Sequence, residues 1–252
     1  MPPKSRKKDF IYGARAVMEA LEANRQIDKI LLVKGMDSEL RRDVADLAQK
    51  RGIPTQTVPS EKLNRMVPEG NHQGVLAFTA LVYYLDLEDI LASLDEQGTT
   101  ALILMLDGVS DVRNFGAIAR TAECMGVHAL VIPEQGSARI NADAMKISAG
   151  ALHHIPVCRV RHLQDAMHLL QGYGIQTVSL TEKAEKSIFE TPFTESCCLI
   201  FGAEDKGITP RLLRSSDHQA SIPLSGKIAS LNVGVSVGMA LLEANRQRQS
   251  AS

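Results

Sequence analysis

The chain has 252 residues, of which 44% are hydrophobic and 4% aromatic, and its formal net charge is −1. This length and composition indicate a globular protein of one or two domains and disfavour an RNA-binding module that depends mainly on base–aromatic stacking. A net charge near zero gives no evidence for nucleic acid, but phosphate binding needs only a local basic patch.

Residues 1–8 are basic and lack an apolar segment, which predicts a disordered tail rather than a secretory signal. No apolar run approaches about 18 residues, so no membrane-spanning helix is predicted. The four cysteines have apolar neighbours and no C-x-x-C spacing, which indicates buried or partly buried free thiols in a cytoplasmic protein. Adjacent His153 and His154 lack an accompanying carboxylate pair, so no metal site is predicted.

Residues 9–80 predict a small α/β unit, in which Val17 and Leu21 share one face of the first helix and residues 37–39 open the second with capping and acidic groups. The expected helices cover 13–24, 37–52 and 60–67, and the expected strands cover 28–35, 53–58 and 74–80.

Basic residues on the second helix are candidates for RNA phosphate contacts, with a solvated helix face as the alternative; they are Arg41, Arg42, Lys50 and Arg51. Residues 81–98 are acidic and contain a short amphipathic helix around 87–94. We interpret this stretch as a linker between two domains.

Residues 99–252 alternate apolar runs with helical stretches, which predicts an α/β domain with a mainly parallel sheet covered by helices on both faces. The predicted strands cover 101–107, 128–133, 154–160, 175–180, 197–202 and 220–224. The predicted helices lie near 114–126, 140–150, 162–172, 209–215 and 231–246.

Three polar, glycine-rich turns follow strands of this sheet, which is where open parallel sheets bind ligands. In the first turn, Asn114 is a potential helix N-cap, Gly116 permits close backbone approach, and Arg120 follows six residues after Asn114. A plain helix cap and a surface cation are the alternative interpretation. The turn holds neither G-x-G-x-x-G nor a Walker A loop, which argues against NAD and nucleoside triphosphates.

In the second turn, Gly202 and Gly207 flank Glu204, and glycine lets a backbone press against a flat ligand. A simple polar turn is the alternative. The third turn passes through the run Ser230-Leu231-Asn232 into a helix rich in small residues, which can approach another backbone closely. A capped core helix is the alternative there, but this polar run is more than a cap needs.

Together these turns resemble a known family. The runs NFGAIAR (114–120), LIFGAEDKGI (199–208) and IPLSGKIASLNVGVSVGMAL (222–241) resemble, in order, the three motifs of the SpoU (TrmH-type) branch of the SPOUT RNA methyltransferases. The stretches YGARAVMEAL (12–21) and NHQGVLA (71–77) resemble the L30e-like substrate domain of the bacterial large-subunit rRNA guanosine methyltransferases in this family.

The resemblance implies a C-terminal SPOUT α/β domain with a deep trefoil knot, preceded by an L30e-like RNA-binding domain. It also implies S-adenosylmethionine as cofactor and a homodimer in which the last helix forms part of the interface. The implied cofactor contacts are Gly202, Ile222 and Leu231, with Ser230 and Thr181 as weaker candidates. The sequence departs from the family pattern at Val112, where proline is expected.

The implied reaction is methylation of a ribose 2′-hydroxyl, expected to belong to a guanosine in 23S rRNA. The implied catalytic residues are Arg120, Asn114, Glu204, Ser230 and Asn232. Because arginine stays protonated, we interpret Arg120 as an electrostatic activator rather than a general base. The alternatives are the same chemistry on tRNA, a non-catalytic RNA-binding protein with a knot fold, and a Rossmann-type oxidoreductase, which the missing dinucleotide motif disfavours.

Overall fold

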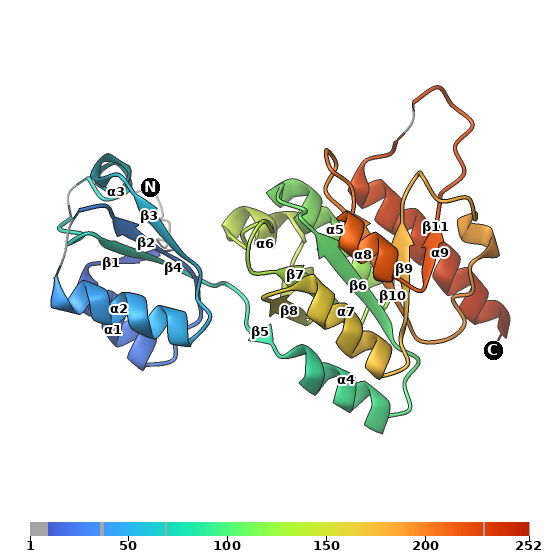
Figure 1. Ribbon diagram of the computed structural model, residues 1–252, viewed down its shortest axis with the longest axis horizontal. Helices are drawn as coiled ribbons and strands as arrows, with labels where there is room; N and C mark the ends of the chain where they lie inside the picture. Colours follow the sequence, from blue (N-terminus) through green and yellow to red (C-terminus); the bar gives the residue numbers. More distant parts are fainter. Residues whose placement is uncertain (1–9, 36–37, 69, 229, 252) are drawn as a thin grey trace, which may run out of the picture. The chain divides into compact units, whose positions relative to one another are not determined.

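The protein consists of two compact units, one ending at Leu81 and one beginning at Val82 (Figure 1). The computed structural model describes residues 10–35, 38–68, 70–228 and 230–251. The tail predicted for residues 1–8 and part of the predicted helix start at 37–39 therefore lie outside the described residues.

The first unit is a four-stranded sheet in the order β1-β4-β2-β3, in which only β2 and β3 pair in parallel. Val17 and Val44 of α1 and α2 are buried against one face of the sheet, and Leu63 of α3 is buried against the other. The elements are β1 (Phe10–Tyr12), α1 (Ala14–Glu22), β2 (Ile27–Val33), α2 (Glu39–Lys50), β3 (Thr55–Val58), α3 (Ser60–Met66) and β4 (Val75–Thr79). The α/β unit predicted here is confirmed.

The second unit is built on a seven-stranded sheet in the order β11-β9-β10-β6-β7-β8-β5, and every strand pairing in it is parallel. The elements up to β8 are β5 (Tyr84–Leu85), α4 (Leu87–Glu96), β6 (Leu102–Asp107), α5 (Val112–Cys124), β7 (Ala129–Pro133), α6 (Ala142–Ile147), η1 (Ala151–His153) and β8 (Val157–Val160). The remaining elements are α7 (Leu163–Gly172), β9 (Gln176–Leu180), η2 (Ile188–Glu190), β10 (Cys197–Gly202), α8 (Pro210–Ser215), β11 (His218–Ala220) and α9 (Val233–Ala251).

Helices cover both faces of this sheet, so its strands are apolar on both sides. On β6, Leu104 belongs to the core formed with α5, α6 and α9, whereas Ile103 and Met105 belong to the core formed with α4, α7 and α8. This confirms the α/β class and the mainly parallel sheet, and it explains why the strands show no alternation of apolar and polar residues.

Three details differ from the sequence-based expectation. The stretch 81–98 is not a linker, because the second unit begins at Val82, β5 pairs with β8 in the sheet, and α4 buries Leu87 and Leu91 against it. The last strand covers His218–Ala220 rather than 220–224. Helix α5 begins before Asn114, and Asp111 is its N-cap, accepting hydrogen bonds from the backbone N–H groups of the first turn. The predicted cap at Asn114 is therefore wrong.

All four cysteines are free thiols, as predicted. Cys158, Cys197 and Cys198 are buried in the sheet of the second unit, as predicted, but Cys124 is exposed at the end of α5, so the burial predicted for it is wrong. Burial, with a smaller effect of nearby Asp86, raises the pKa of Cys158 to about 12. Of the helices in the described ranges, none is long and apolar enough to cross a membrane.

Candidate active site

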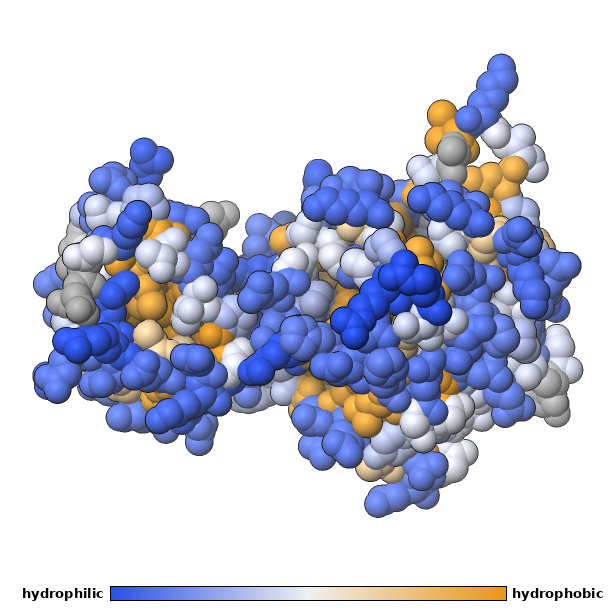
Figure 2. All heavy atoms as spheres, in the orientation of Figure 1, coloured by the Kyte–Doolittle hydropathy of each residue, from blue (hydrophilic) through white to orange (hydrophobic). Residues whose placement is uncertain are grey.

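A pocket of about 360 Å³ lies at the carboxyl end of the second sheet, where the segments that follow β9, β10 and β11 meet. The third of these segments loops out beyond the sheet before α9 and carries hydrophobic and hydrophilic atoms side by side (Figures 1 and 2). The pocket brings together all five residues predicted to contact the cofactor: Gly202, Ile222, Leu231, Ser230 and Thr181. Its mixed apolar and polar lining suits a small organic ligand that is held by a few polar groups.

Gly202 stands where the chain leaves β10 and turns back on itself. A Cβ atom here would lie 2.0 Å from the carbonyl carbon of Gly207, because the backbone N–H of Gly207 donates to the carbonyl of Ala203 at 2.8 Å. Gly116 is similar, since its Cβ would lie 2.8 Å from Ile147 on α6. Both glycines thus allow a close approach within the protein, of the Gly207 backbone at Gly202 and of Ile147 at Gly116.

Asn232 joins all three motif segments. Its Nδ2 donates to Oδ1 of Asn114 at 3.1 Å and to Oε1 of Glu204 at 2.6 Å. Its Oδ1 accepts from the backbone N–H of Gly234 at 2.9 Å, which assigns the oxygen side of the amide and leaves the NH2 group for the other two residues. The side chain therefore caps the start of α9 and orients a carboxylate beside the pocket.

Arg120 lies apart from this junction. It is exposed on α5, it does not line the pocket, and its side chain makes no hydrogen bond or ion pair with another residue in the described part of the chain. Ser230 lines the pocket and is exposed. The structure thus brings Asn114, Glu204 and Asn232 into contact, places Ser230 at the pocket beside them, and leaves the guanidinium of Arg120 facing solvent.

The predicted phosphate contacts of the first unit are partly engaged within the protein. Arg41 donates to the carbonyl oxygen of Val33 at 2.9 Å, and Arg51 donates to that of Leu21. Lys50 is exposed. Within the described ranges, no group of three or more His, Cys, Asp or Glu side chains is placed to hold a metal ion.

Comparison with known proteins identifies the family. The profile of the SpoU rRNA methylase family matches residues 101–242, which is more than half of the chain. The chain belongs to the SpoU rRNA methylase family. A second profile, for the substrate-binding domain of RNA 2′-O ribose methyltransferases, matches residues 10–85. This SpoU-family chain is therefore an S-adenosylmethionine-dependent RNA 2′-O-methyltransferase.

Relatives of this SpoU-family chain match it over nearly its whole length. The 23S rRNA (guanosine-2′-O-)-methyltransferase RlmB of Escherichia coli K12 is 33% identical over 95% of this chain and 99% of that protein. RlmB of Vibrio parahaemolyticus is 36% identical over 96% of this chain and 98% of that protein.

Solved structures share the fold. The SpoU methyltransferase AviRb from Streptomyces viridochromogenes, in complex with the cofactor AdoMet, superimposes with a TM-score of 0.61 at 22% identity, covering 96% of this chain and 90% of that one. The TrmH/SpoU tRNA modifying enzyme of A. aeolicus gives a TM-score of 0.56 at 30% identity, covering 66% of this chain and 85% of that one.

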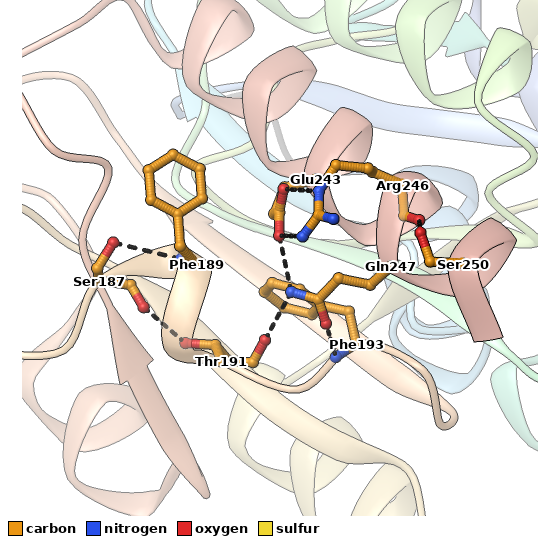
Figure 3. Close-up of polar contacts among 8 residues, drawn as sticks. All are labelled: Ser187, Phe189, Thr191, Phe193, Glu243, Arg246, Gln247 and Ser250. Carbon is orange, nitrogen blue, oxygen red and sulfur yellow. Dashed lines mark hydrogen bonds and ion pairs between the residues drawn. The ribbon is translucent and has the colours of Figure 1, made fainter.

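No SpoU motif indicated Gln247 and Glu243, two residues of α9 that hold the η2 segment in place (Figure 3). Gln247 accepts from the backbone N–H of Phe193 at 2.9 Å and donates to the carbonyl of Thr191 at 3.0 Å. Glu243 accepts from Arg246 and from Gln247, each at 2.8 Å, and the bond from Arg246 lowers the pKa of Glu243. Their spacing of four residues on α9 was the only sequence signal.

Proposed function

We propose that this chain methylates the 2′-hydroxyl of a guanosine in 23S rRNA, in the cytoplasm. The full-length relatives named for that reaction support the choice of substrate. The observation that carries the proposal is the Asn232 junction, which ties the three motif segments together beside the pocket. The same chemistry on tRNA is the second candidate, favoured by the likeness to a tRNA modifying enzyme, which covers only 66% of this chain.

The pocket has the size and the lining to hold S-adenosylmethionine. Its volume of about 360 Å³ is typical of small-ligand sites, Ile222 and Leu231 offer apolar surface, and Gly202 borders it without a side chain. Thr181 and Ser230 add hydroxyl groups. Bound here, S-adenosylmethionine supplies an electrophilic methyl group on a sulfonium.

Arg120 activates the ribose hydroxyl as a fixed positive charge. Its guanidinium keeps its proton, so it stabilises the oxygen as negative charge develops there and holds a neighbouring phosphate through two parallel hydrogen bonds. Asn232 orients Glu204 and Asn114, and Ser230 helps to position the substrate. The hydroxyl proton passes to water, to a phosphate oxygen or to Glu204.

A second copy of the chain completes the active site. Val235, Met239 and Leu242 form an apolar stripe on α9 and are 51%, 44% and 60% exposed. Such a stripe on a helix marks an interaction surface. Helix α9 packs against α5, which carries Arg120, with Gly238 beside Thr121. A homodimer formed through this stripe places the active site near the subunit interface, where the solvent-facing guanidinium of Arg120 can reach the substrate.

Arg120→Ala tests the proposal. Methylation of unmodified 23S rRNA transcript should fall by about 100-fold or more, because a charge that stabilises the developing alkoxide is lost. The dissociation constant for S-adenosylmethionine, measured by calorimetry, should stay unchanged. Arg120→Lys should keep part of the rate, since the charge remains while the planar fork is lost. Near-normal turnover by Arg120→Ala with intact cofactor binding would contradict the assignment.

Arg113→Ala is the matched control, because Arg113 lies on the same helix with a side chain that is 83% exposed. It should methylate the transcript at close to the wild-type rate. Mapping the methylated ribose decides the substrate, since a guanosine in 23S rRNA supports the proposal and a tRNA nucleotide selects the second candidate.

A further inference from the structure

A second pocket, of about 370 Å³, lies at the same carboxyl edge of the sheet and has no part in the mechanism above. It is lined by residues that follow β6, β7 and β8 and by residues that open α8. The two pockets adjoin along one chain segment, because residues 203–208 line the first and Thr209 lines the second. The backbone N–H of Thr209 donates to Asp107 at 2.7 Å, which ties this wall to the end of β6.

Gln164 carries an unmet hydrogen-bonding group in the wall of this second pocket. It lines the pocket, it is only 8% exposed, and its Oε1 is buried without a partner among the described residues. Its Nε2 lies 3.0 Å from Nε2 of His168. That bond forms in either amide orientation, because imidazole Nε2 donates in one tautomer and accepts in the other. One amide atom therefore stays unpaired in both cases, which favours a ligand with a polar edge.

The charges at this pocket leave room for one phosphate contact and disfavour a polyanion. Arg161 and Arg211 both line it, are exposed, and pair with no other residue in the described ranges. His162 begins α7 without a side-chain cap, so first-turn N–H groups of that ten-residue helix remain available. Asp107 and Asp165 also line the pocket and balance the two arginines, which disfavours a polyanion such as a free nucleoside triphosphate.

We propose that the second pocket binds one nucleotide of the substrate RNA, next to the nucleotide that is methylated. This inference rests on the proposed function. Arg161 and Arg211 hold the phosphodiester of that nucleotide, and Gln164 bonds the polar edge of its base. Because the segment 203–209 contributes residues to both pockets, the RNA chain crosses this edge with the reacting ribose at the first pocket and its neighbour at the second.

The double variant Arg161→Ala/Arg211→Ala tests the phosphate contact. Its KM for unmodified 23S rRNA transcript should rise by about tenfold or more, while kcat and the affinity for S-adenosylmethionine stay near wild type. The dependence of log affinity on log salt should become less steep by about 0.7, which corresponds to one lost phosphate contact. Arg214→Ala, on the same helix as Arg211 but outside both pockets, is the matched control and should change nothing. A wild-type KM and salt slope in the double variant would overturn the proposal.

Gln164→Leu tests the base contact separately from a structural role. Leucine fills similar space and removes the unpaired amide atom, so the thermal unfolding temperature should not fall. The KM for the transcript should still rise several-fold. An unchanged KM, or a loss of stability that accounts for the change, overturns the assignment of Gln164.

Filter binding of the transcript without turnover keeps the two proposals apart. If the wild-type protein binds the transcript but does not methylate it, the proposed function fails, and weaker binding by the double variant still supports the pocket. If methylation proceeds and the double variant binds and reacts like wild type, the proposed function stands and the pocket assignment fails.

Discussion

The two pockets at the carboxyl edge of the seven-stranded sheet are similar in size, about 360 and 370 Å³, but they differ in how the sequence encodes them. The first is lined mainly by the segments that follow β10 and β11, which lie within the family motifs, and also by residues 180–183 after β9. The second is lined mainly by residues at or just after the ends of three separate strands, β6, β7 and β8. A site built from loops leaves a readable pattern, whereas a site built from strand ends becomes visible only when the sheet brings those ends together.

The largest expected contrast between the pockets comes from one glycine in each. Gly202→Ala places a Cβ atom against the backbone of Gly207, so we expect it to lower the free energy of unfolding by about 3 kcal/mol and to abolish S-adenosylmethionine binding. Gly108, at the second pocket, has φ +77°, and its added Cβ would lie 3.6 Å from Ala203, an ordinary contact. Gly108→Ala should therefore cost only about 1–2 kcal/mol of backbone strain.

Chemical denaturation and calorimetry of both variants measure this contrast. Gly108→Ala should keep wild-type affinity for S-adenosylmethionine. If Gly202→Ala also bound S-adenosylmethionine with wild-type affinity, the turn after β10 would not shape the cofactor pocket.

A smaller effect on stability is expected from a substitution at the Asn232 junction, beside the first pocket. Asn232→Asp keeps an oxygen to cap α9 but loses the donor to Asn114 and sets a second carboxylate against Glu204. We expect methylation of the transcript to fall by about tenfold or more, with little change in unfolding temperature. Asn232→Ala should lose about 1 kcal/mol of stability as well, because the cap is removed. Wild-type turnover in Asn232→Asp would exclude the junction from catalysis.

Sequence patterns predicted most helices and strands, because long apolar runs on a two-sided parallel sheet are unambiguous. They missed β1 and β5, which have three and two residues and are too short to show a pattern. They displaced β11, because its residues His218–Ala220 are largely polar and pair with β9 through their backbone. The trefoil knot stays a prediction, since it rests on the family resemblance alone.

The site was predictable to the extent that its residues lie in motifs. Asn114, Glu204 and Asn232 were named from those motifs, but their mutual hydrogen bonds depend on the packing of α9 against α5. The crowding of Gly202 by the backbone of Gly207 could not be predicted, because the sequence does not show the path of the turn that follows β10. Gln164 was missed, since a glutamine in the first turn of a helix usually faces solvent.

The smallest expected effect concerns Asp217, which anchors the strand that leads into the first pocket. Its carboxylate accepts from the hydroxyl of Thr177 at 2.7 Å and from the backbone N–H of Thr177 at 2.8 Å, and Gln171 adds a third donor. Burial alone would raise the pKa of Asp217, but these hydrogen bonds outweigh it and hold the pKa below its ordinary value.

A lowered carboxyl pKa stabilises the folded state at pH values above the unfolded pKa of about 4, and this contribution is lost as pH falls through the folded value. Asp217→Asn should therefore be less stable than wild type at pH 7, by under about 1 kcal/mol because the carboxylate is largely solvent-screened. The difference should persist to pH 5.5 and shrink below pH 4. Urea unfolding of both proteins at pH 7, at pH 5.5 and below pH 4 measures this stability difference. A stability difference that grew on acidification would contradict this prediction. It would mean that the hydrogen bonds from Thr177 and Gln171 do not stabilise the Asp217 carboxylate in the folded state.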